Sequence, residues 1–236
     1  MEEILPGALY LVATPIGNLA DITYRAVHIL KNVDLIAAED TRKSRILLNH
    51  YQIKTPLVSY HSYNLKKQTP QLIRHLKEQK SLSLISDAGT PGISDPGYQL
   101  VQAAIEENIR IVPIPGASAL LAALVASGLQ TNRFVYEGFL PLKKGRQTRL
   151  QQLAREERTI VLYESPHRIR RTINDILTVF GDRPCVLARE LTKLYEELYR
   201  GTLSSINEIT KTKTLKGEMV LIIAGKGKKD KSRENG

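Results

Sequence analysis

Short apolar runs alternate with helix-length amphipathic stretches along the first half of the chain. The runs are brief and rich in branched residues, which is typical of strands, whereas the stretches repeat apolar positions at the spacing of a helix. Strands that alternate with helices favour a mostly parallel sheet that is covered by helices on both faces. The predicted strands are 9–13, 34–38, 56–60, 81–86 and 109–114, and the predicted helices are 24–32, 41–51, 68–79 and 98–107.

The second half repeats this alternation after an Ala- and Leu-rich stretch, 118–127, which is apolar on all sides and predicts a buried helix ending at Gly128. The close spacing of the last two strands favours an antiparallel or mixed sheet. The predicted strands are 134–137, 159–164, 185–189, 197–201 and 218–224, and the predicted helices are 146–155, 166–180 and 204–213. We therefore expect two α/β domains, 1–117 and 118–225, and a basic disordered tail, 226–236.

The charge of the chain is unevenly distributed. Lysine and arginine outnumber aspartate and glutamate by 34 to 24, which gives a formal charge of +10 over 236 residues. Residues 1–110 carry 12 basic and 11 acidic side chains, or +1, and residues 111–236 carry 22 and 13, or +9. A basic half indicates a polyanionic partner, with nucleic acid ahead of an anionic membrane.

Several classes of protein are excluded by composition. The single cysteine, Cys185, excludes a disulfide framework and fits a reducing compartment. The most apolar run, 117–126, is shorter than the ~20 residues that a membrane span needs. The first residues lack the basic start of a signal peptide. We therefore expect a cytoplasmic protein that does not span a membrane.

Three Gly- and Pro-rich loops, 14–19, 86–97 and 113–119, each follow a predicted strand. Open α/β sheets bind ligands at the carboxyl ends of strands, so these loops are candidates to hold a small molecule through main-chain groups. The alternative is that they are plain turns. The chain has neither G-x-G-x-x-G after a strand nor a P-loop motif, and its five histidines have no metal-binding spacing. Dinucleotide oxidoreductases, P-loop NTPases and a metal site are therefore disfavoured.

Four polar clusters, 39–42, 61–64, 163–168 and 189–193, also follow predicted strands. Helix capping explains 39–42 and 163–168 as well as a site does, a salt-bridged surface does the same for 189–193, and a plain surface loop explains 61–64 better than a site. The basic side chains of the second half form either a phosphate-binding surface or a solvated face. They include Lys143, Lys144, Arg146, Arg149, Arg168, Arg170, Arg171, Lys193, Arg200 and Lys226.

Five of these segments together resemble one family, the 16S ribosomal RNA cytidine 2′-O-methyltransferases, which have the tetrapyrrole-methylase (class III methyltransferase) fold. The long strings ATPIGNLADIT and SDAGTPGISDPG are the most specific. The resemblance extends from about Gly7 to Gly225. The segments that carry it are Leu9–Thr23, Ala38–Arg42, Ser86–Gly97, Tyr163–Arg168 and Ala188–Lys193.

The resemblance implies two α/β domains of tetrapyrrole-methylase type, with S-adenosylmethionine in the inter-domain cleft. It also implies a homodimer, no metal, and as substrate a cytidine in the decoding region of 16S rRNA in the small ribosomal subunit. The implied cofactor contacts are Pro15, Ile16, Asp87, Ala88, Gly89, Thr90, Pro115, Ser118, Ala119, Tyr163, Ala188 and Ala224.

A ribose hydroxyl is a weak nucleophile, so a carboxylate or histidine that accepts its proton would assist methyl transfer. The candidates are Asp40, Glu164, His167 and Glu190, and Lys193 or Arg189 is a candidate to orient a phosphate. The sequence does not select one base, and positioning of the hydroxyl is an alternative source of the rate.

Two other functions fit the same motifs. A sister methyltransferase that acts on a small tetrapyrrole would share the cofactor loops, but it does not explain the +9 half. A non-catalytic RNA-binding module would explain the charge, but it predicts no binding of S-adenosylmethionine. A methyl-transfer assay separates these functions, whereas salt dependence of binding does not.

Overall fold

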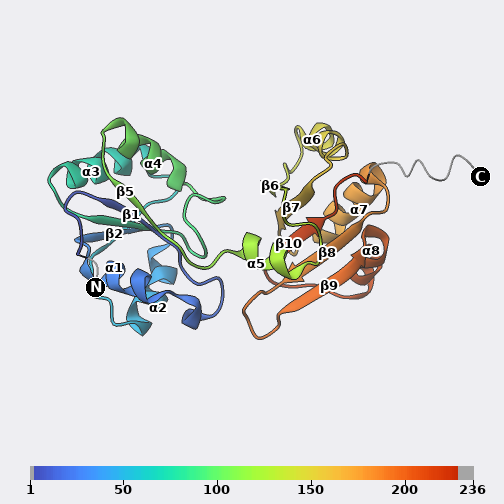
Figure 1. Cartoon of the computed structure of the whole chain (residues 1–236), viewed down its shortest axis with the longest axis horizontal. Helices are drawn as coiled ribbons and strands as arrows, with labels where there is room; N and C mark the ends of the chain where they lie inside the picture. Colours follow the sequence, from blue (N-terminus) through green and yellow to red (C-terminus); the bar gives the residue numbers. More distant parts are fainter. Residues whose placement is uncertain (1–2, 228–236) are drawn as a thin grey trace, which may run out of the picture. The chain divides into compact units, whose positions relative to one another are not determined.

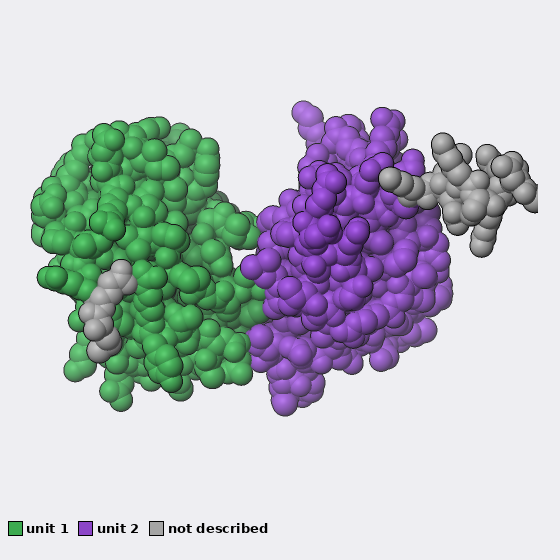
Figure 2. All heavy atoms as spheres, viewed as in Figure 1, with its two compact units in different colours: residues 1–118 green, residues 119–236 purple. Residues whose placement is uncertain are grey.

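The computed structural model describes residues 3–227, which form two compact units with the boundary between Ser118 and Ala119 (Figure 2). Each unit is an α/β structure with its own five-stranded sheet and its own hydrophobic core. Most of the basic disordered tail predicted at 226–236, namely residues 228–236, lies outside the part of the chain that the structure describes. None of the helices that the structure describes is long and apolar enough to cross a membrane.

The sheet of unit 1 is entirely parallel, with strand order β3-β2-β4-β1-β5 (Figure 1). It confirms the parallel sheet that the alternating pattern predicted. Its strands are β1 (Leu9–Val12), β2 (Leu35–Ala38), β3 (Leu57–Ser59), β4 (Leu82–Ile85) and β5 (Ile111–Ile114). Its helices are a short 3-10 turn, η1 (Leu19–Asp21), and α1 (Tyr24–Asn32), α2 (Thr41–His50), α3 (Leu65–Lys77) and α4 (Gly97–Glu106).

The helices of unit 1 cover opposite faces of this sheet (Figure 1). α1 and α2 pack on one face through residues such as Ile29 and Leu48, while α3 and α4 pack on the other through Leu76 and Leu100. The chain therefore leaves β1 towards one face and leaves the adjacent β4 towards the other. Neighbouring parallel strands whose connections diverge in this way define the switch point where open α/β sheets bind ligands.

The sheet of unit 2 is mixed, with strand order β6-β7-β10-β8-β9, and only the β6–β7 pair is parallel. This confirms the mixed sheet predicted from the close spacing of the last strands. Its strands are β6 (Phe134–Phe139), β7 (Thr159–Glu164), β8 (Pro184–Arg189), β9 (Glu197–Thr202) and β10 (Met219–Ile223). Its helices are α5 (Ala119–Ala126), α6 (Arg146–Leu153), α7 (Ile169–Phe180) and α8 (Leu203–Thr212).

The core of unit 2 is formed by α6, α7 and α8 against one face of the sheet, where Leu221 of β10 is fully buried. The helix predicted to be buried on all sides, α5, packs against β10 through one face only. Leu121 and Val125 on its other face are 51% and 72% exposed, so that prediction was wrong. An apolar composition without periodicity could not indicate which face would meet the sheet.

Two helix starts differ from the prediction by three residues. α7 begins at Ile169 rather than at 166, because the carbonyl of Ser165 accepts hydrogen bonds from the amides of Arg168 and Ile169 in a preceding turn. α3 begins at Leu65, three residues before the predicted start. The side chain of Leu65 is buried in the core under α3, and this packing extends the helix towards its amino terminus.

The single thiol reports on the integrity of unit 2. Cys185 is fully buried on β8, and burial raises the pKa of its thiol to about 12. We expect that a thiol reagent will not label the folded protein at neutral pH, because the thiol of Cys185 is out of reach of the reagent and stays protonated. Leu221→Ala leaves a core cavity, should lower the free energy of unfolding by about 2–5 kcal/mol, and should speed labelling at least ~30-fold.

The matched control for that experiment is Leu194→Ala, because Leu194 is 87% exposed. Its effect on unfolding should stay within about 0.5 kcal/mol. Equal labelling rates in the two variants would contradict the packing described for β10.

Candidate functional site

The three Gly- and Pro-rich loops meet at the carboxyl ends of β4, β1 and β5, which are adjacent strands. Thr14 and Gly89 exchange two backbone hydrogen bonds of 2.9 Å and so join the first loop to the second. The hydroxyl of Thr90 donates to the carbonyl of Ala117, 3.3 Å away, and joins the second loop to the third. Main-chain contacts thus hold the three loops together at the switch point of the sheet.

Close approach of the loops requires glycine at two positions. Gly89 has a φ of +82°, in the left-handed region that favours glycine. A Cβ placed on Gly116 would lie 2.9 Å from the Cβ of Ala13, too close without a shift of the backbone. Ile16 is buried beneath Gly89, whereas Thr90 is exposed. The loops therefore present main-chain and small polar groups over an apolar floor.

Asp95 gives the second loop its shape. Its Oδ1 accepts hydrogen bonds from the amides of Gly92 (2.7 Å) and Gly97 (2.8 Å), while its buried Oδ2 has no partner among the described residues. A Cβ on Gly97 would meet the amide nitrogen of Gly92 at 2.9 Å. Asp95 therefore closes the second loop through hydrogen bonds to backbone amides on both sides of it in the sequence.

A group of acidic residues surrounds this point. Asp87 accepts hydrogen bonds from the amide of Asp40 (2.9 Å) and from Nζ of Lys43 (2.7 Å). Burial raises the pKa of Glu39, and the charges of Asp87 and Asp95 raise it further. Four carboxylates against the two cations Arg42 and Lys43 leave this end of the sheet negative. It therefore favours a ligand that carries positive charge.

Asp40 caps the amino terminus of α2. Its carboxylate accepts hydrogen bonds from the amide (2.9 Å), Nε (3.1 Å) and Nη2 (2.8 Å) of Arg42. The hydrogen bonds from the Arg42 side chain hold the pKa of Asp40 well below its usual range. A carboxylate with so low a pKa is a weak proton acceptor at neutral pH.

In unit 2, two of the residues predicted as catalytic lie together. Nζ of Lys193 is 3.0 Å from Oε1 of Glu190 and 2.9 Å from Oε2 of Glu218. The amide of Glu218 also donates to Glu190 Oε1, at 2.9 Å. Burial acts to raise the pKa of Glu190, but these hydrogen bonds and nearby cations outweigh it and lower the pKa overall. We call Glu190, Lys193 and Glu218 the lysine-centred cluster.

The backbone around this cluster is strained. Glu190 and Thr192 have φ values of 48° and 67°, in a region of backbone conformation that residues other than glycine rarely adopt. Gly217 leaves room for the Glu190 carboxylate, because a Cβ there would overlap it. Strained residues persist where the surroundings fix them, and they concentrate at functional sites.

The three cofactor contacts predicted deeper in unit 2 do not all lie together. Tyr163 of β7 and Ala188 of β8 both pair with Val220 of β10, at the level of the lysine-centred cluster. The hydroxyl of Tyr163 accepts a hydrogen bond from the amide of Leu120, and burial raises its pKa to about 12. Ala224 follows the opposite end of β10, four residues or ~13 Å along the strand.

Glu164 and Arg146 are interior groups. Glu164 is 2% exposed, and its oxygens accept hydrogen bonds from the amide of Ser165 (2.8 Å) and the hydroxyl of Thr172 (2.6 Å). Arg146 is 5% exposed and bonds to Asp175 (2.9 Å) and Thr172 (2.9 Å). The prediction that Arg146 belongs to a phosphate-binding surface was therefore wrong, because its charge is neutralised inside the unit.

Sequence reasoning missed Lys43 and Glu218 as site residues. Lys43 lies one helical turn after Asp40, and Glu218 directly precedes an apolar strand. Their partners, Asp87 and Glu190, lie 44 and 28 residues away in sequence, so no local pattern could reveal the pairs. Among residues 3–227, no group of three or more His, Cys, Asp or Glu is arranged to hold a metal ion.

Comparison with known proteins gives the class to which this fold and these loops belong. Residues 8–207 match the Tetrapyrrole (Corrin/Porphyrin) Methylases, and the chain belongs to this family. It is 55% identical to the ribosomal RNA small subunit methyltransferase I of Synechocystis sp. over 234 residues, 97% of this chain and 84% of that protein. The protein of the same name from Thermotoga maritima is 48% identical over 221 residues, 93% and 99% of the two chains.

The solved structures show the same fold. Uroporphyrin-III C-methyl transferase from Thermus thermophilus, complexed with S-adenyl homocysteine, matches with a TM-score of 0.67 and 19% identity over 92% of this chain and 97% of that one. These comparisons confirm the family and the fold class that the motifs of the sequence predicted.

The lysine-centred cluster should contribute stability in a pH-dependent way. Because the folded-state pKa of Glu190 is lowered, its contribution is present above the unfolded value of 4.5 and lost as pH falls below it. Lys193→Met should therefore lower the free energy of unfolding by about 1–2 kcal/mol at neutral pH. Denaturant titrations at neutral pH and below 4.5 should show this difference shrinking in acid.

Lys211→Met is the control, since it removes the same charge from an exposed pair with Glu208. It should change the free energy of unfolding by at most about 0.5 kcal/mol. A pH-independent loss of stability in Lys193→Met would contradict the role given to Glu190.

Proposed function

We propose that the chain transfers a methyl group from S-adenosylmethionine to the 2′-hydroxyl of a cytidine ribose in the decoding region of 16S rRNA, within the small ribosomal subunit. The observation that carries the proposal is the junction of the three loops at the β1/β4 switch point. The RNA substrate is supported by relatives named ribosomal RNA small subunit methyltransferase I, whose sequences are about half identical to that of this chain. The cytidine and its 2′-hydroxyl rest on the resemblance of the motifs.

The residues of unit 1 fit this cofactor. The negative end of the sheet around Asp87 suits a ligand that carries a sulfonium and an ammonium. The absence of a side chain on Gly116 lets the third loop approach Ala13 of the first loop closely, which brings the main-chain groups of the two loops together. The residues of unit 1 that would hold it are Pro15, Ile16, Asp87, Ala88, Gly89, Thr90, Pro115 and Ser118. Ala119, Tyr163 and Ala188 stay as predicted contacts from unit 2, and the position of Ala224 at the far end of β10 gives it no such part.

When bound, S-adenosylmethionine would supply an electrophilic methyl group. An O–C bond would form as the S–C bond breaks, with S-adenosylhomocysteine as the leaving group and the hydroxyl proton passing to a nearby base or to water. The chain must hold the ribose hydroxyl in line with that methyl group. Lys193 uses two of its three N–H donors on Glu190 and Glu218, which leaves one to orient a phosphate. We therefore assign Lys193 to substrate orientation.

Three of the four candidate bases are poorly suited to accept the proton of the hydroxyl. The carboxylate of Asp40 has a low pKa, the oxygens of Glu164 are bonded inside unit 2, and the pKa of Glu190 is lowered. Their lowered pKa values make Asp40 and Glu190 weak proton acceptors near neutral pH, and the oxygens of Glu164 are already engaged in hydrogen bonds. His167 is the one of the four candidate bases that these contacts do not engage, and we propose that orientation of the hydroxyl adds to any proton transfer it provides.

The decisive assay is transfer of labelled methyl from S-adenosylmethionine to purified, unmethylated small ribosomal subunits, with the product mapped to base or ribose. We expect one 2′-O-methylated cytidine in 16S rRNA. Cofactor binding without transfer to subunits would overturn the ribosomal assignment and favour a small tetrapyrrole as substrate. Absence of cofactor binding would favour a non-catalytic RNA-binding module.

The contact between Gly116 and Ala13 gives a second test. Gly116→Ala should weaken binding of S-adenosylmethionine at least ~10-fold in calorimetry, because the added methyl pushes the third loop away from the first. Gly227→Ala is the control, since a Cβ at that position meets nothing within 4 Å. Equal affinities of the two variants would remove the loop junction from the cofactor site.

A further inference from the structure

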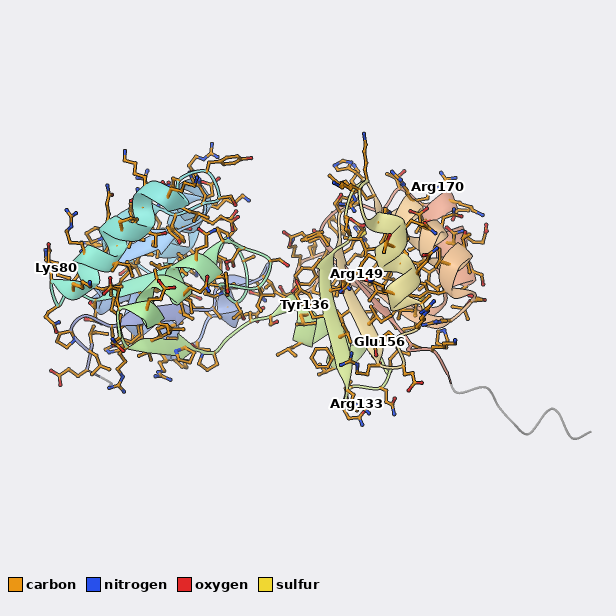
Figure 3. All side chains as sticks on the ribbon, turned by 90° about the horizontal axis from the view of Figure 1, so that it is seen from above. Lys80, Arg133, Tyr136, Arg149, Glu156 and Arg170 are labelled. Carbon is orange, nitrogen blue, oxygen red and sulfur yellow. The ribbon has the colours of Figure 1, made fainter. Side chains whose placement is uncertain are left out.

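Two adjoining hollows open at one end of unit 2, away from the lysine-centred cluster. Their volumes are about 770 and 510 Å³, and Arg155 and Lys226 line both. The larger hollow is bounded by residues that precede β6 and β7, among them Arg133 and Glu156, which lie towards the same end of unit 2 in Figure 3. Lys193 lies just beyond the opposite end of the sheet. The two ends of the sheet are ~16 Å apart along β7 alone.

The hollows are strongly basic. Five cations and two carboxylates line them together, an excess of three positive charges. One carboxylate, Glu156, is bonded to Arg158 through both its oxygens. Arg133, Arg155 and Lys226 are exposed and have no carboxylate within ion-pair distance in the described part of the chain. Unpaired cations around a concave surface attract an anion.

A buried arginine in the smaller hollow points to the same ligand. Arg183 is 8% exposed, and within residues 3–227 it pairs with no carboxylate. Its Nη2 donates to the carbonyl of Ala154 at 2.5 Å, and its guanidinium lies 4.8 Å from the ring centre of Phe180. Its buried Nη1 has no hydrogen-bond partner in the part of the chain that the structure describes. A buried charge without a counter-charge is unfavourable, and an anion in the hollow would offset that cost.

We propose that the two hollows form one phosphodiester-binding site that holds the RNA backbone at a distance from the reacting ribose. The inference rests on the proposed function, which supplies RNA as the partner. The planar guanidinium groups of Arg133 and Arg155 match the geometry of phosphate oxygens, and the amides of Gln130 and Asn132 offer partners for ribose hydroxyls. The site therefore binds backbone without reading base sequence.

One other possible occupant of the hollows is the C-terminal segment of this chain, and its charge argues against it. Residues 228–236 follow directly from Gly227 at the rim of the larger hollow and contain four basic and two acidic side chains. Their net charge has the same sign as the hollow, so electrostatics disfavours them as its ligand. The same residues add positive charge to the sequence that adjoins the site.

The test compares two triple variants that lose the same charge. Arg133→Gln, Arg155→Gln and Lys226→Gln together change exposed residues of the hollows, and Lys31→Gln, Lys54→Gln and Arg110→Gln together change exposed cations of unit 1. Binding of a labelled oligouridylate is followed by fluorescence anisotropy over a range of salt concentrations. We expect the hollow variant to bind about 10-fold more weakly at physiological salt, with a salt slope smaller by about 2, and the control to match the unaltered protein.

Methyl transfer gives an independent reading. With small ribosomal subunits as substrate, the hollow variant should raise KM about 10-fold and leave kcat and the affinity for S-adenosylmethionine unchanged, because the site lies away from the reacting ribose. If the unaltered protein methylates no subunits but its oligouridylate binding still depends on the hollow residues, the proposed function fails and this inference stands. If subunits are methylated and the two triple variants behave alike, the inference fails and the proposed function stands.

Two further outcomes would overturn the site as described. Displacement of oligouridylate by an equal concentration of inorganic phosphate would identify free phosphate as the ligand instead of RNA backbone. Arg183→Met removes the buried charge while keeping its volume, and it should weaken oligouridylate binding while Cys185 stays protected from thiol reagents. Unchanged binding by this variant would exclude the smaller hollow from the site.

Discussion

The pairing of Thr14 with Gly89 is the contact on which the candidate site depends. It joins the loops that follow β1 and β4, two adjacent strands whose connections leave towards opposite faces of the sheet. This divergence opens the crevice in which a parallel sheet binds a ligand, and the backbone pair fixes its floor. Gly116 then brings the third loop against Ala13. Because these contacts are made by backbone and small side chains, they hold the three loops together without a bound ligand.

The elements of the fold were predictable because each has a local signature. Within residues 3–227, the ten strands and seven of the eight α-helices occur where alternation or helical spacing indicated them, and α5 occurs where an apolar run did. The parallel and mixed sheets follow from the alternation and spacing of the strands. The errors fell where the signature is weak. A uniformly apolar helix, α5, has no periodicity to show that Leu121 and Val125 face outwards. The start of α7 depends on a turn at Ser165 that competes with helix formation.

The candidate site was predictable only in part, for a different reason. The loops were found because glycine and proline mark backbone geometry directly in the sequence. The charged partners were not, because a pair such as Asp87 and Lys43, 44 residues apart, exists only after the sheet has brought β2 and β4 together. The lysine-centred cluster combines predictable and unpredictable residues. Glu190 and Lys193 share a local motif, whereas Glu218 reaches them only across the β8–β10 ladder. Local sequence therefore reveals the shape of the site better than its electrostatics.

Two buried arginines in unit 2 show how burial separates structural from binding groups. Arg146 and Arg183 are both more than nine-tenths buried, and either would be taken from sequence alone as part of a basic face. The guanidinium of Arg146 donates hydrogen bonds to Asp175 and Thr172, and these bonds hold the loop before α6 against α7. Arg183 has no carboxylate within ion-pair distance in residues 3–227 and keeps an unbonded Nη1 beside a hollow lined by further cations. A charge that the fold buries without balancing it is most simply explained by a counter-charge from outside, and for a methyltransferase that acts on RNA that counter-charge is a backbone phosphate.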